Sequence, residues 1–244
     1  MNRLVLLSGW GCDARIWQAL DGHWPPGIAV SAPDWPGYGQ QPESHEPDCL
    51  ADTARGMAEA LPTQAVWVGW SLGGLLAEAL LDHLPAPRAL VVIGMGPRFC
   101  HPDGVDGEEL ATFRRAFRRD PEATRAHFLR WQLRGEPSPR AAHRQLLGLI
   151  GQAPPAGLTT LAAGLDQLAR LDASRRRGVA PCPVYRLAGE ADPLLAPAAR
   201  EAADWRLAKA GHCPMLSQPE RLAALLTAVA NAPALPPTAP EALP

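Results

Sequence analysis

This chain of 244 residues has no long apolar run and no closely spaced pair of cysteines. The first absence argues against a membrane-spanning protein, and the second against a disulfide-rich secreted one. No apolar run approaches the length of about 18 residues that a membrane-spanning helix needs, and the apolar stretch at the N-terminus is too short for a signal peptide. The cysteines form no C-x-x-C pair and are odd in number, which predicts free thiols in a reducing cytoplasm. They are Cys12, Cys49, Cys100, Cys182 and Cys213.

Lysine is almost absent, since Lys209 is the only one, and neither sign of charge is in large excess. The formal net charge of −2 gives no indication of nucleic acid binding. Arginine is nevertheless concentrated, with 14 Arg against 9 Asp and Glu between Arg98 and Arg177, and nine of these arginines lie between Arg114 and Arg144. This region is either a solvated helix surface or a docking face for an anionic partner.

Short apolar segments alternate with helical patterns through most of the chain. Such alternation predicts an α/β domain with a mostly parallel sheet that helices cover on both faces. Asp13 is a candidate N-cap for a helix over 13–20, and further helices are expected over 49–61, 75–81 and 219–230. The expected strands cover residues 4–7, 28–32, 65–68, 89–93, 184–187 and 205–208.

No strand is expected between Gly94 and Pro183. Four helical stretches are predicted there instead, and we interpret residues 98–181 as a helical lid inserted into a core made of 1–97 and 182–231. Residues 232–244 are mostly Ala and Pro, a composition typical of a disordered tail. The four helical stretches of the lid cover residues 108–119, 121–134, 139–150 and 158–171.

A G-x-S-x-G motif at residues 69–73 lies between an expected strand and an expected helix. The pentapeptide alone also occurs in ordinary glycine-rich loops, but the strand before it and the helix after it are typical of a nucleophile elbow. In that turn the glycines leave space for a sharp backbone bend that exposes the serine hydroxyl. Ser71 is therefore the candidate nucleophile.

A serine nucleophile needs a general base and an acid that orients the base. Where the serine sits on an elbow of this kind, the partners follow it in the chain order Asp or Glu, then His. His212 follows the last expected strand, where this arrangement requires the base. Asp192 follows the strand before it and is the candidate acid, with Glu190 as the alternative. Both residues also have a purely structural interpretation. His212 could be an ordinary surface histidine, and Asp192 could be a helix cap or turn residue before Pro193.

Acyl transfer also requires hydrogen-bond donors for the developing oxyanion. The backbone N–H of Leu72, directly after the nucleophile, is the first candidate. The N–H of Trp10, in the glycine-rich loop 8–11 after the first strand, is the second, although that loop is also typical of a simple tight turn.

With these residues placed, the chain resembles the pimeloyl-[acyl-carrier protein] methyl ester esterases of biotin synthesis, a family of α/β hydrolases. The similarity is carried by residues 67–75, by loops 8–11 and 34–39, and by the order of Asp192 and His212. It implies the α/β-hydrolase fold and a cytoplasmic serine carboxylesterase that uses a Ser-His-Asp triad, with a carrier protein bearing a pimeloyl methyl ester as partner. Neither a metal nor a cofactor is expected, because no H-E-x-x-H motif or cysteine cluster is present.

The resemblance extends into the lid. It implies that Arg140 and Arg144, one helical turn apart, dock the carrier protein. Ser8 stands where the family usually has His, and Ala123 and His127 stand where it has two further arginines. The substrate-binding residues implied are Trp10, Phe128, Leu129, Arg130, Trp131 and Gln132.

Two other functions remain open from the sequence. A general short-chain carboxylesterase, or another hydrolase of this fold acting on a small ester, would carry the same triad and a different lid. A binding protein without activity would be expected to have lost Ser71, Asp192 or His212, and all three are present. We expect a monomer that binds neither nucleic acid nor membrane.

Overall fold

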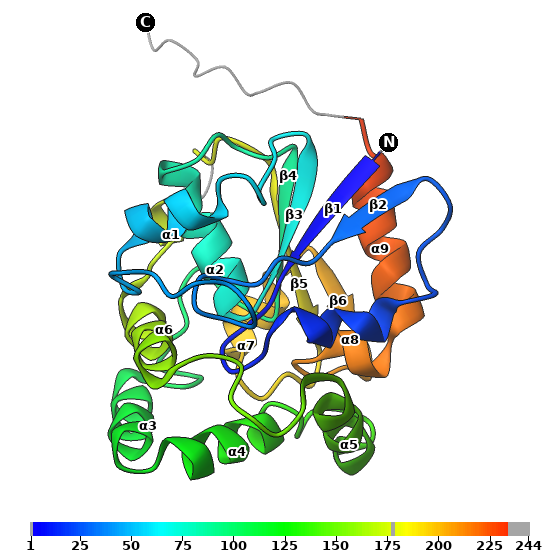
Figure 1. The fold of residues 1–244 in the computed structure, drawn as a ribbon. Coiled ribbons are helices and arrows are strands. Elements are labelled where there is room, and N and C mark those ends of the chain that lie inside the picture. Colours follow the sequence, from blue (N-terminus) through cyan, green and yellow to red (C-terminus); the bar gives the residue numbers. More distant parts are fainter. Residues whose placement is uncertain (1, 177–178, 234–244) are drawn as a thin grey trace, which may run out of the picture.

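The computed structural model describes residues 2–176 and 179–233, and in this part of the chain six strands form one sheet (Figure 1). The strand order is β2-β1-β3-β4-β5-β6, and every neighbouring pair is parallel. The two central strands β3 and β4 are buried along their whole length, as expected where helices cover both faces. The strands are β1 (Asn2–Leu7), β2 (Ile28–Ser31), β3 (Ala65–Trp70), β4 (Ala89–Ile93), β5 (Val184–Gly189) and β6 (Trp205–Leu207).

Helices cover the two faces of this sheet. In Figure 1, α1 and α2 lie on one side of it, and α8 and α9 lie on the other with the short 3-10 helix η1. No helix of the described residues has the length and apolarity needed to cross a membrane. These elements are η1 (Ala14–Leu20), α1 (Leu50–Met57), α2 (Leu72–Ala79), the 3-10 turn η2 (Leu80–Asp82), α7 (Pro197–Glu201), α8 (Pro214–Ser217) and α9 (Pro219–Asn231).

Four helices between β4 and β5 lie together beyond the carboxyl ends of the strands (Figure 1). Asp106 begins the first of them with a capping box, in which its side chain and that of Glu109 each accept a backbone N–H. Asp120 ends this helix and its side chain caps the next one, which starts at Pro121. The elements of this lid segment are α3 (Gly107–Arg119), α4 (Pro121–Trp131), α5 (Pro139–Ile150), α6 (Leu158–Arg170) and the 3-10 turn η3 (Ser174–Arg176).

The alternation of strands and helices predicted from the sequence is confirmed, with differences at the element ends. The segment after Asp13 is a 3-10 helix, although the Asp13 side chain caps it as predicted by accepting the N–H of Arg15. Helix α2 begins at Leu72, earlier than predicted, because the turn at Ser71 leads directly into it. The short helices α7 and α8 were not predicted, and residues 234–244 of the predicted tail lie outside the described residues.

Candidate active site

Ser71 occupies the sharp turn between β3 and α2 with φ 55° and ψ −128°, a backbone conformation that L residues rarely adopt. The glycines around it allow this turn because other backbone atoms take the space of a side chain. A Cβ on Gly69 would lie 2.4 Å from the Cα of Gly74, and one on Gly73 would lie 2.4 Å from the carbonyl oxygen of Ser8. The predicted elbow thus has the strained geometry that presents a serine hydroxyl.

The predicted acid and base meet at the carboxyl end of the sheet. His212 lies between β6 and α8, Asp192 follows β5, and both side chains are fully buried. His212 Nδ1 lies 2.8 Å from Asp192 Oδ2, while the backbone N–H of Leu194 donates to the other carboxylate oxygen at 2.8 Å. Glu190, the alternative acid, is exposed. The geometry therefore favours Asp192 as the residue that orients the imidazole.

The remaining ring nitrogen of His212 is not engaged by another described residue. Its Nε2 is buried and has no hydrogen-bond partner among the described residues. With Nδ1–H donated to the carboxylate of Asp192, Nε2 carries the lone pair of a general base. In this arrangement Nε2 is the ring nitrogen that can accept a proton.

Neighbouring residues tie His212 to the elbow. The indole Nε1 of Trp70, the residue before Ser71, donates to the carbonyl oxygen of His212 at 2.8 Å, and the two rings lie 5.5 Å apart. Gly94, directly after β4, faces the acid–base pair, since a Cβ there would lie 3.0 Å from Nδ1 of His212 and 3.2 Å from Oδ2 of Asp192. The structure thus places all three predicted catalytic residues at the same edge of the sheet, after the carboxyl ends of β3, β5 and β6.

The two predicted oxyanion donors flank the elbow. Leu72 is the first residue of α2, where backbone N–H groups lack partners within the helix. Trp10 follows Gly9, and the loop passes so close to the nucleophile that a Cβ on Gly9 would lie 2.9 Å from the Cβ of Ser71. Both backbone N–H groups therefore belong to segments that pack around Ser71, as an oxyanion hole requires.

The Trp10 side chain reaches from this loop into the lid segment. It is 1% exposed, and its Nε1 donates to the carbonyl oxygen of Leu161 at 2.8 Å. Three phenylalanines meet it edge to face, with ring centroids at 5.7 Å for Phe113, 5.6 Å for Phe117 and 5.0 Å for Phe128. An apolar pocket beside the indole is lined by Trp10, Phe99, Val105, Leu110, Phe113, Phe128, Trp131, Leu165 and Leu168, with Glu109 at its edge.

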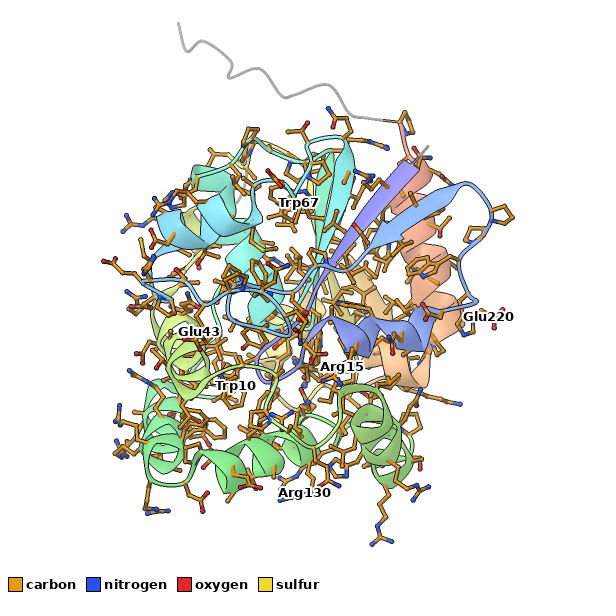
Figure 2. The ribbon with its side chains drawn as sticks, viewed as in Figure 1. Trp10, Arg15, Glu43, Trp67, Arg130 and Glu220 are labelled. Carbon is orange, nitrogen blue, oxygen red and sulfur yellow. The ribbon has the colours of Figure 1, made fainter. Side chains whose placement is uncertain are left out.

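The segment 128–132, implied to bind substrate, is divided between the inside and the outside of α4. Phe128 and Trp131 line the apolar pocket, and Leu129 is buried. Gln132 is fully buried, and neither polar atom of its side-chain amide has a hydrogen-bond partner among the described residues. Arg130 is exposed and points away from the sheet (Figure 2), so the structure does not bring it to the pocket.

Arginines of the lid segment are likewise of two kinds. Arg140 and Arg144 are exposed on α5, and Arg130 in the last turn of α4 and Arg134 just after that helix are exposed as well. Arg125 is 5% exposed, and its guanidinium donates to the carbonyl oxygens of Gly11 at 3.2 Å and Gln152 at 2.9 Å.

Burial lowers the pKa of Arg125, and its contacts bind the lid segment to the loop after β1. Arg125 is therefore part of the lid's attachment and is not available on the surface. The sequence does carry a signal for this orientation, because Arg125 is spaced three, four and seven residues from Phe128, Leu129 and Gln132, which places all four on one face of a helix.

Two thiols near the site do not compete with Ser71. Cys12 and Cys213 are fully buried, and burial raises the pKa of Cys12 to about 12 and that of Cys213 well above its usual value. Both therefore stay protonated at neutral pH, and a thiol is a far weaker nucleophile than a thiolate. Within the described residues, no group of three His, Cys, Asp or Glu side chains could hold a metal ion.

Comparison with known proteins gives relatives along nearly the whole chain. Residues 4–225 match the alpha/beta hydrolase family. The chain is 31% identical over 229 residues to a pimeloyl-[acyl-carrier protein] methyl ester esterase of Vibrio vulnificus, covering 89% of each protein. It is 30% identical over 240 residues to a protein of the same name from Photorhabdus laumondii, covering 93% of this chain and 92% of that protein.

Solved structures share the fold at lower sequence identity. An esterase from Exiguobacterium antarcticum superposes with a TM-score of 0.76 at 18% identity, covering 95% of this chain and 92% of the other. A thermophilic esterase from Thermogutta terrifontis gives a TM-score of 0.71 at 23% identity, covering 93% of this chain and 89% of the other. These similarities confirm the predicted fold class and bear on the fold alone.

Proposed function

Because the chain belongs to the alpha/beta hydrolase family and, within it, to the family of the pimeloyl-[acyl-carrier protein] methyl ester esterases, we propose that it hydrolyses the methyl ester of a pimeloyl group carried on an acyl-carrier protein. The observation that carries this proposal is the buried pair of Asp192 and His212 at the same edge of the sheet as a strained Ser71. The names of the two relatives supply the substrate class.

Acylation uses the three side chains in the roles that their positions suit. Ser71 Oγ attacks the ester carbonyl while Nε2 of His212 takes its proton, and Asp192 stabilises the resulting imidazolium through Nδ1–H. The backbone N–H groups of Leu72 and Trp10 stabilise the oxyanion of the tetrahedral intermediate. The carbon–oxygen bond to the alcohol then breaks, and His212 gives its proton to the departing methanol.

Deacylation repeats these steps with water. His212 takes a proton from a water molecule whose oxygen attacks the acyl-enzyme carbonyl, and it then returns that proton to Ser71 as the acid leaves. Every proton transfer in the cycle passes through Nε2, the atom that has no other partner among the described residues. The chemistry balances with water alone and requires no cofactor or metal.

The lid segment suits the remainder of such a substrate. We propose that residues 98–181 act as a lid, in which the apolar side chains beside Trp10 move apart to take the methylene chain, because the space among them is only about 20 Å³ in this structure. Arg140 and Arg144 on the outer surface would meet the acidic surface of the carrier protein, because guanidinium groups pair well with carboxylate and phosphate. The protein would act as a monomer in the cytoplasm, a setting compatible with its five free thiols.

A substrate comparison tests this proposal. The methyl ester of the pimeloyl-carrier protein, the same ester without the carrier, and p-nitrophenyl acetate would be supplied to the enzyme, with acid product quantified by mass spectrometry. We expect the highest kcat/KM for the carrier-bound ester and no turnover with Ser71→Ala. Equal kcat/KM for carrier-bound and free esters would instead favour a general short-chain carboxylesterase.

A further inference from the structure

The peptide group between His212 and Cys213 is held from both of its sides. Its carbonyl oxygen accepts a hydrogen bond from the indole Nε1 of Trp70 at 2.8 Å. Its N–H donates to Oε1 of Glu136 at 2.7 Å. Trp70 belongs to the core strand that ends at the nucleophile, whereas Glu136 belongs to the lid segment between α4 and α5. The backbone that carries the imidazole is thus fixed between core and lid.

The approach of the lid segment at this point is unusually close. A Cβ on Gly135 would lie 1.8 Å from the carbonyl oxygen of Ala191, the residue before Asp192. A Cβ on Gly211, the residue before His212, would lie 2.7 Å from the carbonyl carbon of Gly135 and 2.8 Å from Oε1 of Glu136. Glycine is required at both positions because backbone fills the space of a side chain. The lid segment therefore contacts both loops that carry the acid and the base.

Glu136 is an uncommon choice for such a position. Its side chain is 4% exposed, and its second oxygen, Oε2, is buried without a hydrogen-bond partner among the described residues. A buried carboxyl oxygen with no partner costs folding free energy, so an apolar residue would satisfy packing alone better. The charge is felt at the neighbouring thiol, since burial first and Glu136 second raise the pKa of Cys213. A requirement for an acceptor at the His212–Cys213 peptide explains why the residue is polar.

We propose that Glu136 is a positioning residue that sets the orientation of His212 from the lid segment, so that the base is correctly aligned only while the lid is seated. The inference rests on the proposed function, because it concerns the imidazole that would activate Ser71. Glu136 does not touch the reacting atoms; it acts through the backbone N–H of Cys213. Misplacement of a catalytic group by about 1 Å can cost about 100-fold in rate, so one hydrogen bond at this point has a measurable effect on kcat.

A matched pair of variants isolates the hydrogen bond. Glu136→Gln keeps a carbonyl acceptor of similar size, whereas Glu136→Met keeps the size and leaves only a thioether sulfur, which is a weak acceptor. Both would be assayed with p-nitrophenyl acetate and for the rate of modification of Ser71 by a fluorophosphonate. Arg170→Ala is the control, because it removes a different link between lid and core, the ion pair with Asp48, away from the catalytic loops. Thermal unfolding of each variant would verify that it is folded at the assay temperature.

We expect Glu136→Met to lower kcat and the fluorophosphonate rate by about 10- to 100-fold with little change in KM, while Glu136→Gln stays within about threefold of the original. Arg170→Ala should leave both rates nearly unchanged. Activity of Glu136→Met within twofold of the original would overturn the proposal, as would equal losses in the Met and Gln variants. Failure of the unsubstituted protein to react at Ser71 would instead overturn the proposed function, and the two failures are therefore distinguishable.

Discussion

At the strand ends, Ser71, Asp192 and His212 are held by backbone strain, by buried hydrogen bonds and by glycines that admit no side chain. The lid segment is built differently, from helices whose inner faces supply aromatic rings and whose outer faces supply exposed arginines. The strand ends fix the groups that would make and break bonds, whereas the lid segment supplies the surfaces that would select a substrate. Substitutions in the first region should therefore remove chemistry, and those in the second should change preference among substrates.

The largest effect expected is at the nucleophile. Ser71→Ala removes the attacking oxygen and should lower kcat on the order of a millionfold, as measured in other triads, with residual rate from the oxyanion donors. Fluorophosphonate labelling followed by mass spectrometry should find the adduct on Ser71 and none in the variant. Activity within tenfold of the original would exclude Ser71 from the mechanism.

The acid comes next. Asp192→Asn should cost about 10,000-fold in kcat, because the amide no longer holds the imidazole in the tautomer that leaves Nε2 as the base. Glu190→Gln is the matched control on the same loop and should have little effect, since Glu190 is exposed. A severe loss in the Glu190 variant and a mild one in the Asp192 variant would reassign the acid.

On the outer face of the lid, a charge reversal should separate the substrates. Changing Arg140 and Arg144 together to Glu should raise KM for the carrier-bound ester about tenfold or more and leave p-nitrophenyl acetate unaffected. Salt should weaken the original enzyme in the same selective way, since exposed charges are screened over about 8–10 Å. Equal losses on both substrates would show that these arginines hold the lid together instead.

A second charge reversal, on another helix of the lid segment, tests whether the proposed docking face is confined to α5. Arg115 and Arg118 are equally exposed, but they lie on α3, which is separated from α5 by α4 (Figure 1). Changing both of them to Glu should leave KM for the carrier-bound ester within about threefold if contact is local to α5. A loss as large as that of the α5 pair would indicate an attraction spread over the whole lid.

The inner face of the lid should give a smaller change. Trp131→Ala shortens the wall of the apolar pocket while leaving the buried Phe128 in place, and should reduce the preference for longer acyl chains over acetate about 3- to 10-fold. Leu158→Ala removes apolar surface from an exposed position on α6 and serves as the control. An unchanged chain-length profile in Trp131→Ala would place the acyl chain elsewhere.

The smallest expected effect is at the thiols. Iodoacetamide at neutral pH should not modify Cys12 or Cys213 in the folded protein, because both are buried and their raised pKa values keep them protonated. Activity should therefore survive the treatment, and peptide mapping would show which cysteines reacted. Rapid alkylation of Cys213 with loss of activity would mean that the His212 loop opens readily.

The fold and the arrangement of the candidate triad could be predicted because each carries a local signal. Buried apolar runs indicate parallel strands. The glycines of the G-x-S-x-G motif indicate the elbow, because they leave space for the unusual backbone conformation of Ser71. The order of Ser71, Asp192 and His212 is the one in which triad residues follow a nucleophile elbow in this fold, so the elbow indicates where along the chain to look for the acid and the base.

The contacts between lid and core could not be predicted in this way. Glu136 lies in a connection between two helices, where a glutamate normally faces water, and only the three-dimensional structure shows Gly135 packed against the loop of Asp192. Arg125 and Arg130 have the same chemistry, and their opposite exposure depends on which face of α4 meets the core. Local propensity does not encode which distant segment a residue will meet.

Trp10 belongs both to the predicted oxyanion hole and to the wall of the apolar pocket. Its backbone N–H is a predicted oxyanion donor. Its indole forms one wall of the apolar pocket and donates a hydrogen bond to the carbonyl oxygen of Leu161 in the lid segment. A substitution that enlarges the pocket at this residue would also disturb the loop beside Ser71. A lineage adapting to new acyl groups should therefore keep Trp10 and vary Phe113, Phe128 or Trp131, so sequence diversity in the pocket should be confined to the lid side.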